Sequence, residues 1–594
     1  MRPDNPLIVQ PDRSLMLHTV QSRLDASGQL MKDEAGRPMT EEHARYSEAR
    51  DRLAVFAELE KSPDYLHTYR ISPVSIWNAA ALGVTADEIL ATLEDLACVP
   101  IPPNIDHDVR EWVGRYGLLQ IVRREQGFEL VAGDRTVVED VLGHDAVRKH
   151  CTLGPEGQVL LDDLQRGLIK QALIRIGFPV DDRGGYLEGD PLDIQLRETC
   201  RSGAPFGLRS YQENAAKAFH AGGTELGGSG VVVLPCGAGK TVTGMAVMSL
   251  VGAKTLVLTT NTVAVRQWRE EILDKTELTE DQVGEYTGET KEVKPVTITT
   301  YQMLTWRRDK TGGFEHFEIF SSENWGLVVY DEVHLLPAPI FRVTADLQAR
   351  RRLGLTATLV REDGKEDDVF CLIGPKRFDV PWKVLESQGF IAEARCIEVR
   401  AGMDDHLRTV YFGSGARARF RVASENPAKV AVVERLIARH PEGRILIIGQ
   451  YIEQLESLSR TLRAPLITGK TPNPERERLY QRFKSGEDRL LIVSKVGNFA
   501  IDLPDANIAI QVSGTFGSRQ EEAQRLGRIL RPKSDGSAAV FYSVVTAGTR
   551  DQEFAEKRQL FLTEQGYTYE IIEAARLDQG SAGTAEQEQQ EVTG

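Results

Sequence analysis

Residues 230–250 have types and spacings that suit the binding of a phosphate ester. The apolar run 231–234 predicts a buried strand, and Lys240-Thr241 opens an apolar-periodic stretch that predicts a helix. Between them, Pro235-Cys236-Gly237-Ala238-Gly239 has small side chains, so its backbone N–H groups can turn toward an anion. This GxGKT form of a phosphate loop carries Leu234 where the full pattern has glycine. It predicts that Lys240 meets terminal phosphates and that the Thr241 hydroxyl holds Mg²⁺, the alternative being an ordinary Gly-rich turn.

A second group, Asp331-Glu332-Val333-His334, directly follows the apolar run 327–330. A carboxylate at the end of a strand, in the same sheet as a phosphate loop, is suited to Mg²⁺. Asp331 is therefore the candidate metal ligand, and Glu332 is the candidate base that orients and deprotonates the attacking water. We expect His334 to connect this site to a neighbouring motif. The alternative is an acidic strand end on the surface.

A third group lies nearly 300 residues later, in Gln524-Arg525-Leu526-Gly527-Arg528-Ile529-Leu530-Arg531. Arg528 and Arg531 are three residues apart, so they share one face of a helix. Two guanidinium groups on one face can clamp a γ-phosphate, a contribution of about 10³–10⁵ in rate where an arginine finger has been measured. A solvated basic helix is the alternative for this pattern alone.

The elements that must position these groups alternate between strand and helix from Leu208 onward, which predicts parallel sheets. Apolar runs occur at 231–234, 255–258, 296–299, 327–330 and 353–356, and a second series at 445–448, 489–493, 507–512 and 538–545. Residues 380–430 interrupt the rhythm. The fold class is therefore α/β, with two tandem recombinase-like (P-loop) parallel-sheet domains.

Two smaller modules are expected before them. In residues 1–116, short helices dominate the pattern, with one beginning at Thr40 and another after a cap at Thr85. This module is winged-helix-like or a plain helical adaptor. In residues 117–204, strands at 117–123 and 128–131 and a helix at 136–142 predict a small α/β module. The tail 577–594 lacks an apolar face and is predicted to be disordered.

Composition excludes several classes of protein. No apolar run reaches 18 residues and the N-terminus has no long apolar segment, so neither a membrane span nor a secretory signal is predicted. The six cysteines are scattered without a CxxC pair, which argues against a zinc ribbon and favours a reducing, cytoplasmic location. The net charge of −15 means that any nucleic acid must be bound by local basic grooves.

Together these motifs resemble the superfamily 2 helicases, and more narrowly the XPB family of DNA repair helicases in its bacterial form. The DEVH form of the acidic motif points there, as does Arg361-Glu362-Asp363 after Leu355-Thr356-Ala357-Thr358, which matches the family's RED motif. Residues 494–504 and 522–532 are similar to the fifth and sixth motifs, and 208–212 to the glutamine motif. The resemblance is strong over 205–550 and weaker over 5–10 and 69–122.

The resemblance implies two helicase domains, 205–385 and 386–576, that close on ATP and Mg²⁺. It assigns the following residues to nucleotide binding: Arg209, Gln212, Pro235, Cys236, Gly237, Ala238, Gly239, Lys240, Thr241 and Asp502. It assigns Lys240, Asp331, Glu332, Gln524, Arg528 and Arg531 to hydrolysis, and Thr241 and Asp331 to the metal. It assigns the following to DNA: Thr259, Arg266, Thr300, Arg361, Glu362, Asp363, Ser494 and Lys495.

Several of these roles have alternatives. Thr259 and Thr300 equally suit a strand end or a helix cap, and the RED loop suits either a DNA-opening wedge or an ion pair formed on closure. Residues 401–425 occupy the place of the family's thumb insert, where mixed basic and aromatic side chains suit single-strand binding or a packed linker helix. Residues 117–204 occupy the place of a damage-recognition-like domain.

The expected function is that of an ATP-dependent 3′→5′ DNA helicase or translocase acting on single-stranded and forked DNA, in DNA repair. The rivals are a translocase on duplex DNA that does not separate strands, an ATP-gated DNA clamp, and an RNA-directed enzyme. The resemblance also suggests a repair nuclease as partner. We expect a monomer with no membrane association.

Overall fold

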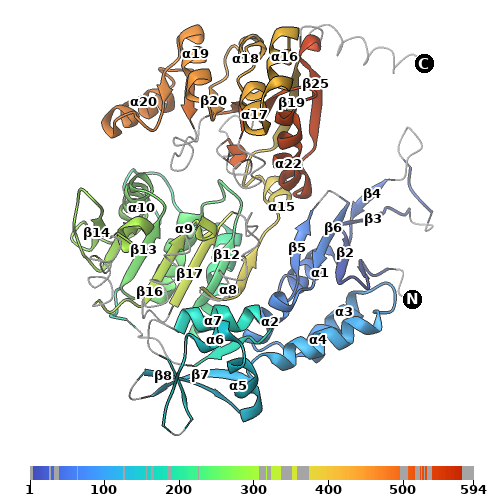
Figure 1. Ribbon diagram of the computed structural model, residues 1–594, viewed down its shortest axis with the longest axis vertical. Helices are drawn as coiled ribbons and strands as arrows, with labels where there is room; N and C mark the ends of the chain where they lie inside the picture. The colour runs from blue at the N-terminus through green and yellow to red at the C-terminus, as the bar shows by residue number, and fades with distance from the viewer. Residues whose placement is uncertain are drawn as a thin grey trace. The chain divides into compact units, whose positions relative to one another are not determined.

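The structure is a computed structural model of the chain (Figure 1). It describes residues 4–25, 29–32, 39–62, 65–124, 127–155, 157–161, 166–183, 189–224, 227–306, 316, 323–335, 351–357, 369, 373–494, 506–514, 522, 525–527, 529–530 and 538–577. Two compact units are present: Met1–Leu234 with Gly239–Val380, and Pro235–Ala238 with Pro381–Gly594. Within the described ranges no helix is long and apolar enough to cross a membrane.

The N-terminal part of the first unit contains an antiparallel sheet in the order β1 (Leu7–Val9), β2 (Ser14–His18), β6 (Leu66–Arg70) and β5 (Glu58–Lys61). Helices α1 (Tyr46–Leu53), α2 (Pro73–Ala81), α3 (Ala86–Leu96) and α4 (Pro103–Arg115) complete it. The predicted cap at Thr85 is confirmed, because its side chain and that of Glu88 cap the start of α3 reciprocally.

Two predictions for this part are wrong. Residues 40–42 form strand β4 (Thr40–Glu42), paired with β3 (Val20–Ser22), and the helix begins only at Tyr46. The part is also not purely helical, since it carries the four-stranded sheet. These strands are only three to five residues long, and β5 and β6 consist mostly of polar residues, so the sheet leaves no long apolar run to detect.

A five-stranded sheet follows, in the order β11 (Val180–Asp182), β7 (Leu119–Arg124), β8 (Gly127–Ala132), β10 (Val159–Leu161) and β9 (Thr152–Leu153). It packs with α5 (Arg135–Leu142), α6 (Asp145–Arg148) and α7 (Arg166–Arg175) around a core of its own. The predicted strands and helix of this module are confirmed within two residues. The strand pair β7–β8 belongs to this sheet, so it does not form the wing of a winged helix.

The larger sheet of the first unit has seven parallel strands in the order β14 (Val283–Tyr286), β15 (Val296–Thr300), β13 (Thr255–Thr259), β16 (Leu327–Asp331), β17 (Arg351–Thr356), β12 (Ser229–Val233) and β18 (Lys376–Asp379). Its helices include α8 (Ser210–His220), α9 (Lys240–Val251), α10 (Thr262–Lys275) and α11 (Tyr301–Leu304). All five predicted strands are confirmed. The edge strands β14 and β18 were not predicted because they carry polar residues.

The second unit repeats this architecture with seven parallel strands in the order β21 (Leu466–Ile467), β22 (Leu490–Ser494), β20 (Ile445–Gly449), β23 (Ile508–Gln511), β24 (Ala539–Thr546), β19 (Ala394–Ala401) and β25 (Tyr569–Glu573). Its helices include α15 (Trp382–Ser387), α16 (Asp405–Gly413), α17 (Ala416–Ser424), α18 (Ala428–Arg439), α19 (Ile452–Leu462), α20 (Asn473–Ser485) and α22 (Arg550–Glu564). The prediction of two tandem parallel-sheet domains is confirmed. Residues 380–430, expected to interrupt the rhythm, contain the internal strand β19.

Candidate active site

The predicted phosphate loop connects β12 to the first turn of α9. Gly237 and Gly239 have φ angles of 82° and 77°, a left-handed conformation that glycine adopts without the strain of a side chain. Gly239 is the N-cap of α9, and Lys240 and Thr241 are its first residues. The positive end of the helix dipole and its first N–H groups are thus available to an anion. Leu234, where the full motif has glycine, is completely buried and is a core residue.

Gln212 of α8 lies against this loop. Its side chain is buried, and its Oε1 accepts a hydrogen bond of 3.0 Å from the backbone N–H of Arg209. A methyl group placed on Gly239 would come within 2.6 Å of Gln212 Nε2, so the amide packs directly on the start of α9. The structure therefore brings together the predicted glutamine motif and the predicted phosphate loop.

The acidic motif lies at the carboxyl end of β16. Asp331 is the last residue of the strand, and Glu332 follows it with a left-handed φ of 50°, which is uncommon for a non-glycine residue. Glu332 Oε1 lies 3.3 Å from Lys240 Nζ in α9. The parallel sheet thus places the predicted phosphate-binding lysine beside the predicted base.

Trp268 of α10 holds the side chain of Asp331. Its indole Nε1 donates a hydrogen bond of 2.9 Å to Asp331 Oδ2, while the backbone N–H of Glu332 donates one of 3.0 Å to Oδ1. The Tyr301 hydroxyl donates to the backbone carbonyl of Asp331 at 2.7 Å. Trp268 was predicted to be a core residue, and its 2% exposure confirms this. Its second role was missed, although a buried indole N–H usually has an acceptor.

The electrostatics of this strand end suit a cation. Burial raises the pKa of Asp331 to about 6, and the charge of Glu332 adds to the rise, while the Trp268 hydrogen bond and Lys240 oppose it. Two adjacent carboxylates with one lysine carry a net negative charge. A divalent cation would stabilise both carboxylates in their ionised form, so the residues present fit Mg²⁺ bound with a nucleotide.

His334 connects this strand end to the next one, as predicted. Its Nδ1 lies 2.7 Å from the hydroxyl of Thr356, the last residue of β17, and 3.5 Å from Glu332 Oε2. His334 is buried. The segment Leu355-Thr356-Ala357 is thereby coupled to the candidate base through one imidazole ring.

Two of the predicted DNA-binding threonines lie at the same edge of the sheet. Thr259 ends β13 and Thr300 ends β15, and they face each other in the strand register. The Thr259 hydroxyl donates to the carbonyls of Thr299 and Asn261, each at 3.2 Å, and the Thr300 hydroxyl caps α11. Both residues are buried. Their hydroxyls therefore serve a strand end and a helix cap, and a role in DNA binding stays a prediction.

Two further DNA-binding predictions fall on described residues. Arg266 is exposed on α10 and forms an ion pair of 2.7 Å with Glu289. Ser494 is the last residue of β22 and is buried. The remaining predicted site residues lie outside the described residues: Arg361, Glu362, Asp363, Lys495, Asp502, Gln524, Arg528 and Arg531.

Residues beside the predicted arginine finger form a buried polar network in the second unit. Arg525 donates to Gln511 Oε1, and Gln511 Nε2 donates to Glu522 Oε2 at 2.9 Å. Tyr569 of β25 donates to Glu522 Oε1 at 3.4 Å. Arg525 and Glu522 are almost completely buried. Sequence reasoning missed Arg525, whose charge is used to anchor this segment to β23.

The predicted thumb insert forms α16 and α17. Tyr411 and Phe420 are buried, and the Tyr411 hydroxyl accepts from the backbone N–H of Arg550 at 3.0 Å. Arg421 forms ion pairs with Glu425 and Glu453. These contacts match the packed linker alternative. Phe412, which is 61% exposed, remains available for stacking with a base.

The two parallel sheets, the phosphate loop and the acidic strand end define a superfamily 2 helicase-type ATPase. Family models agree: residues 385–593 match "ERCC3/RAD25/XPB C-terminal helicase", residues 36–152 match "Helicase conserved C-terminal domain", and residues 205–361 match "Type III restriction enzyme, res subunit".

The sequence identity to curated proteins shows to which family this chain belongs. The chain is 49% identical to "DNA 3'-5' helicase XPB" of Mycobacterium tuberculosis, over 97% of this chain and 99% of that protein. It is also 49% identical to the protein of the same name from Kineococcus radiotolerans, over 97% of this chain and 98% of that protein. It is 35% identical to "General transcription and DNA repair factor IIH helicase/translocase subunit XPB" of Antonospora locustae, over 89% of this chain and 79% of that protein. The chain belongs to the XPB family.

Proposed function

We propose that this chain is an ATP-dependent 3′→5′ DNA helicase that opens duplex DNA, and that it acts in DNA repair. The identity of 49% over nearly the full length of two proteins named as 3′–5′ DNA helicases supports the activity and its direction. The single structural observation that carries the proposal is the approach of Lys240 Nζ to Glu332 Oε1 at 3.3 Å, beside Asp331. This ion pair supports the proposal because the candidate phosphate-binding lysine and the candidate base belong to one site.

In the proposed site, the loop Pro235-Cys236-Gly237-Ala238-Gly239 and the start of α9 bind the phosphates through backbone N–H groups. Thr241 and Asp331 would hold Mg²⁺. When bound, Mg²⁺ neutralises charge on the phosphate oxygens. Lys240 binds the terminal phosphate, and Glu332 accepts a proton from the attacking water. Because these two side chains are neighbours, Glu332 would activate a water molecule next to the phosphate that Lys240 binds.

The contribution of the second helicase domain is also a proposal. Gln524, Arg528 and Arg531 would complete the site and stabilise the charge of the transferred phosphoryl group, and Asp502 would contact the nucleotide. Gln212 would contact the adenine, and Arg209 would contribute to nucleotide binding. The packing of Gln212 on Gly239 supports a role of Gln212 in nucleotide binding, because its amide lies against the phosphate loop.

The proposed DNA contacts come from both domains: Thr259, Arg266, Thr300, the Arg361-Glu362-Asp363 loop, Ser494 and Lys495.

The family resemblance supports three further proposals. These are domain boundaries at 116, 204, 385 and 576, a repair nuclease as partner, and a monomeric state. A cytoplasmic location is proposed because four of the described cysteines, Cys98, Cys151, Cys200 and Cys396, are free thiols.

A translocase that moves on duplex DNA without separating strands is the second candidate, and the name of the Antonospora relative includes the word translocase. The experiment compares ATPase rate with strand displacement on forked DNA, and ATPase stimulation by DNA with stimulation by RNA of equal length. Displacement that tracks ATPase on DNA supports the helicase. Hydrolysis without displacement favours the translocase or a clamp, and preference for RNA would overturn the DNA assignment.

A further inference from the structure

One tryptophan of this chain is exposed. Trp306, two residues after α11, is 43% exposed. The other five tryptophans are at most 9% exposed: Trp77, Trp112, Trp268, Trp325 and Trp382. A single exposed apolar side chain is common on protein surfaces, so Trp306 becomes informative only through its neighbours.

The neighbours of Trp306 include two further rings, those of His316 and Tyr286. The ring centroids of Trp306 and His316 lie 5.4 Å apart with a tilt of 33°, and the His316 ring meets the Tyr286 ring edge-on at 5.6 Å. These separations are typical of interacting aromatic side chains. We call Tyr286, Trp306 and His316 the aromatic cluster. Tyr286 is buried, so Trp306 is the exposed member of the cluster.

Hydrogen bonds orient the imidazole ring of His316. Lys291 Nζ lies 3.4 Å from His316 Nε2, and the Tyr286 hydroxyl lies 3.1 Å from Nδ1. An ammonium group can only donate, so Nε2 is the acceptor and the imidazole proton is on Nδ1, which donates to Tyr286. The ring against which Trp306 lies is therefore fixed at both nitrogens, and Trp306 has an ordered support.

The aromatic cluster lies at the carboxyl edge of the parallel sheet of the first unit. Tyr286 is the last residue of β14 and pairs with Thr299 of β15, one residue before Thr300. The loop that follows β14 contains Glu289, which forms the ion pair with Arg266. The aromatic cluster thus adjoins Thr300 and Arg266, two of the residues predicted to bind DNA.

A cation accompanies the aromatic cluster. Lys291 is exposed, and its Nζ lies 4.6 Å from the centroid of the Tyr286 ring. Lys291 forms no ion pair with a carboxylate of the described part of the chain. An aromatic ring on which a base can stack, next to a positive charge for the backbone, is the combination that proteins use to bind single strands without sequence preference.

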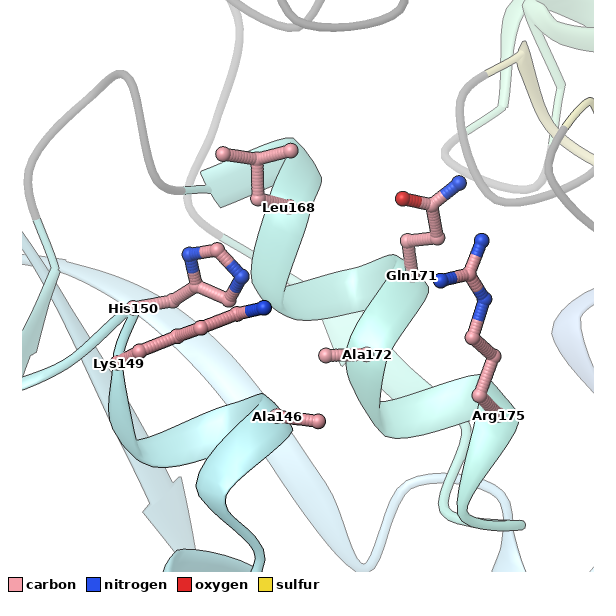
Figure 2. A pocket seen from close by; sticks show the side chains of 7 residues that line it. All are labelled: Ala146, Lys149, His150, Leu168, Gln171, Ala172 and Arg175. Carbon is pink, nitrogen blue, oxygen red and sulfur yellow. The ribbon is translucent and has the colours of Figure 1, made fainter. Parts of the chain in front are cut away.

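The hollow of the small α/β module lacks this combination. It lies between α6 and α7 and is lined by seven side chains (Figure 2). His150 contributes the only ring among them, and alanines and one leucine contribute the apolar contacts. A base would find no indole or phenyl face among these residues, so the hollow does not compete with Trp306 as a stacking site.

We infer that Trp306 is a stacking platform for a base of single-stranded DNA, and that Lys291 binds a phosphate of the same strand. This role rests on the proposed function, because a DNA strand must cross the carboxyl edge of this sheet. The contacts proposed above for Thr300 and Arg266 suit the sugar–phosphate backbone. A stack on Trp306 would add a contact to a base, and any base can make it because every base has a π-face.

An exposed indole is also a typical anchor of a protein interface. That role makes a different prediction from ours. A protein partner would cover Trp306 whether or not DNA carries a base nearby, whereas a stacking platform needs a base at one position of the strand. The test therefore changes the base as well as the side chain.

The first experiment measures the affinity of the full chain for single-stranded oligonucleotides of equal length and charge, in which one abasic site is moved along the strand. For the wild type we expect a position at which loss of the base weakens binding about 5-fold or more, as for a typical stacked base. Trp306→Ala should remove the penalty at that position, and Trp306→Phe should keep most of it. The control is Leu250→Ala on α9, which is also 43% exposed and should keep the whole penalty.

The outcomes separate this role of Trp306 from the proposed function. An abasic penalty of equal size in the wild type and in Trp306→Ala, or no penalty at any position in the wild type, overturns the stacking platform. If the wild type still displaces strands, the helicase function stands. A wild type that binds no single-stranded DNA overturns both.

The second experiment uses the wild-type chain alone, so it does not depend on the folding of a variant. Single-stranded DNA with 5-iodouracil in place of thymine is irradiated in the complex, and the crosslinked peptides are identified by mass spectrometry. We expect a crosslink at Trp306 that excess unmodified strand suppresses. Crosslinks at other residues with none at Trp306 would contradict stacking on this ring.

The third experiment tests Lys291 through the salt dependence of single-stranded DNA binding. If Lys291 binds one phosphate, Lys291→Gln lowers the slope of log affinity against log salt by about 0.7. The control is Lys217→Gln on α8, whose lysine forms an ion pair with Glu213. This control should keep the wild-type slope. A wild-type slope in Lys291→Gln would refute the phosphate contact.

Discussion

The indole N–H of Trp268 donates a 2.9 Å hydrogen bond to Oδ2 of Asp331, so a core residue of α10 orients the carboxylate proposed to hold Mg²⁺. The same indole packs on Gly244 of α9, where an added methyl group would lie 2.6 Å from its ring. Trp268 therefore touches both the helix that follows the phosphate loop and the acidic strand end. Its ring links the positions of two elements that must act on one nucleotide.

Replacing Trp268 with phenylalanine keeps an aromatic ring and removes the donor. We expect the Mg²⁺ concentration for half-maximal ATPase activity to rise about 10-fold or more, because residues that orient metal ligands typically contribute 10–100-fold. The control is Trp77→Phe, which removes a comparable hydrogen bond, to the Trp112 carbonyl, in the N-terminal part. Equal Mg²⁺ dependence in both variants would show that the Trp268 bond is only structural.

Gly239→Ala should weaken nucleotide binding for two separate reasons. The residue has a left-handed φ of 77°, which costs roughly 1–2 kcal/mol with a side chain, and the new methyl group would meet Gln212 Nε2. Gly203→Ala is the control, because Gly203 has a φ of 86° with open space around it. We expect both variants to lose stability in thermal melts and only Gly239→Ala to lose ATP affinity. ATP binding by Gly239→Ala at wild-type affinity would contradict this account of the loop.

A buried ion pair stabilises the second unit. Lys429 Nζ lies 2.6 Å from Asp551 Oδ2, and both side chains are 1% exposed. Lys429→Met leaves Asp551 buried without its cation, a change that costs about 3–5 kcal/mol. The double variant Lys429→Met/Asp551→Leu removes both charges and should recover part of that loss. Hydrogen exchange in α18 and α22 would measure both effects, and unchanged protection in Lys429→Met would refute them.

His67 should make the N-terminal part sensitive to acid. Burial lowers the pKa of His67 to about 4, well below the 6.5 of an unperturbed histidine. In the unfolded chain His67 therefore binds a proton near pH 6.5, whereas in the folded chain it binds one only near pH 4. Stability contributed by neutral His67 is complete above pH 6.5, falls as the pH drops through this window, and amounts to about 3 kcal/mol at most.

Hydrogen exchange of β6 between pH 7 and pH 4, corrected for intrinsic exchange, checks this prediction. His67→Gln should flatten the profile, whereas His107→Ala, at an exposed histidine of α4, should leave it unchanged. A profile in His67→Gln as steep as that of the wild type would exclude His67 as the acid-sensitive group.

The sequence predicted the central strands of both large sheets because buried parallel strands read as continuous apolar runs, such as Leu256-Val257-Leu258. It missed edge strands like β18, whose side chains are only half-buried, and short polar strands near the N-terminus such as β5. Lys240, Asp331 and Glu332 could be predicted as site residues because their chemistry is tied to local spacing. Trp268 was not assigned to the site, because its hydrogen bond to Asp331 joins residues 63 positions apart and depends on strand order.

In the proposed mechanism, Glu332 drives 3′→5′ strand separation by activating water for ATP hydrolysis. The most direct measurement is ATP-dependent strand displacement on 3′-tailed and 5′-tailed duplexes by the wild type and by Glu332→Gln, with nucleotide and DNA affinities measured alongside. We predict displacement of the 3′-tailed duplex by the wild type only. Glu332→Gln should bind both ligands normally while its turnover falls by about 10²–10⁴, the usual contribution of a general base. Normal turnover in Glu332→Gln, or displacement of the 5′-tailed duplex alone, would contradict the account.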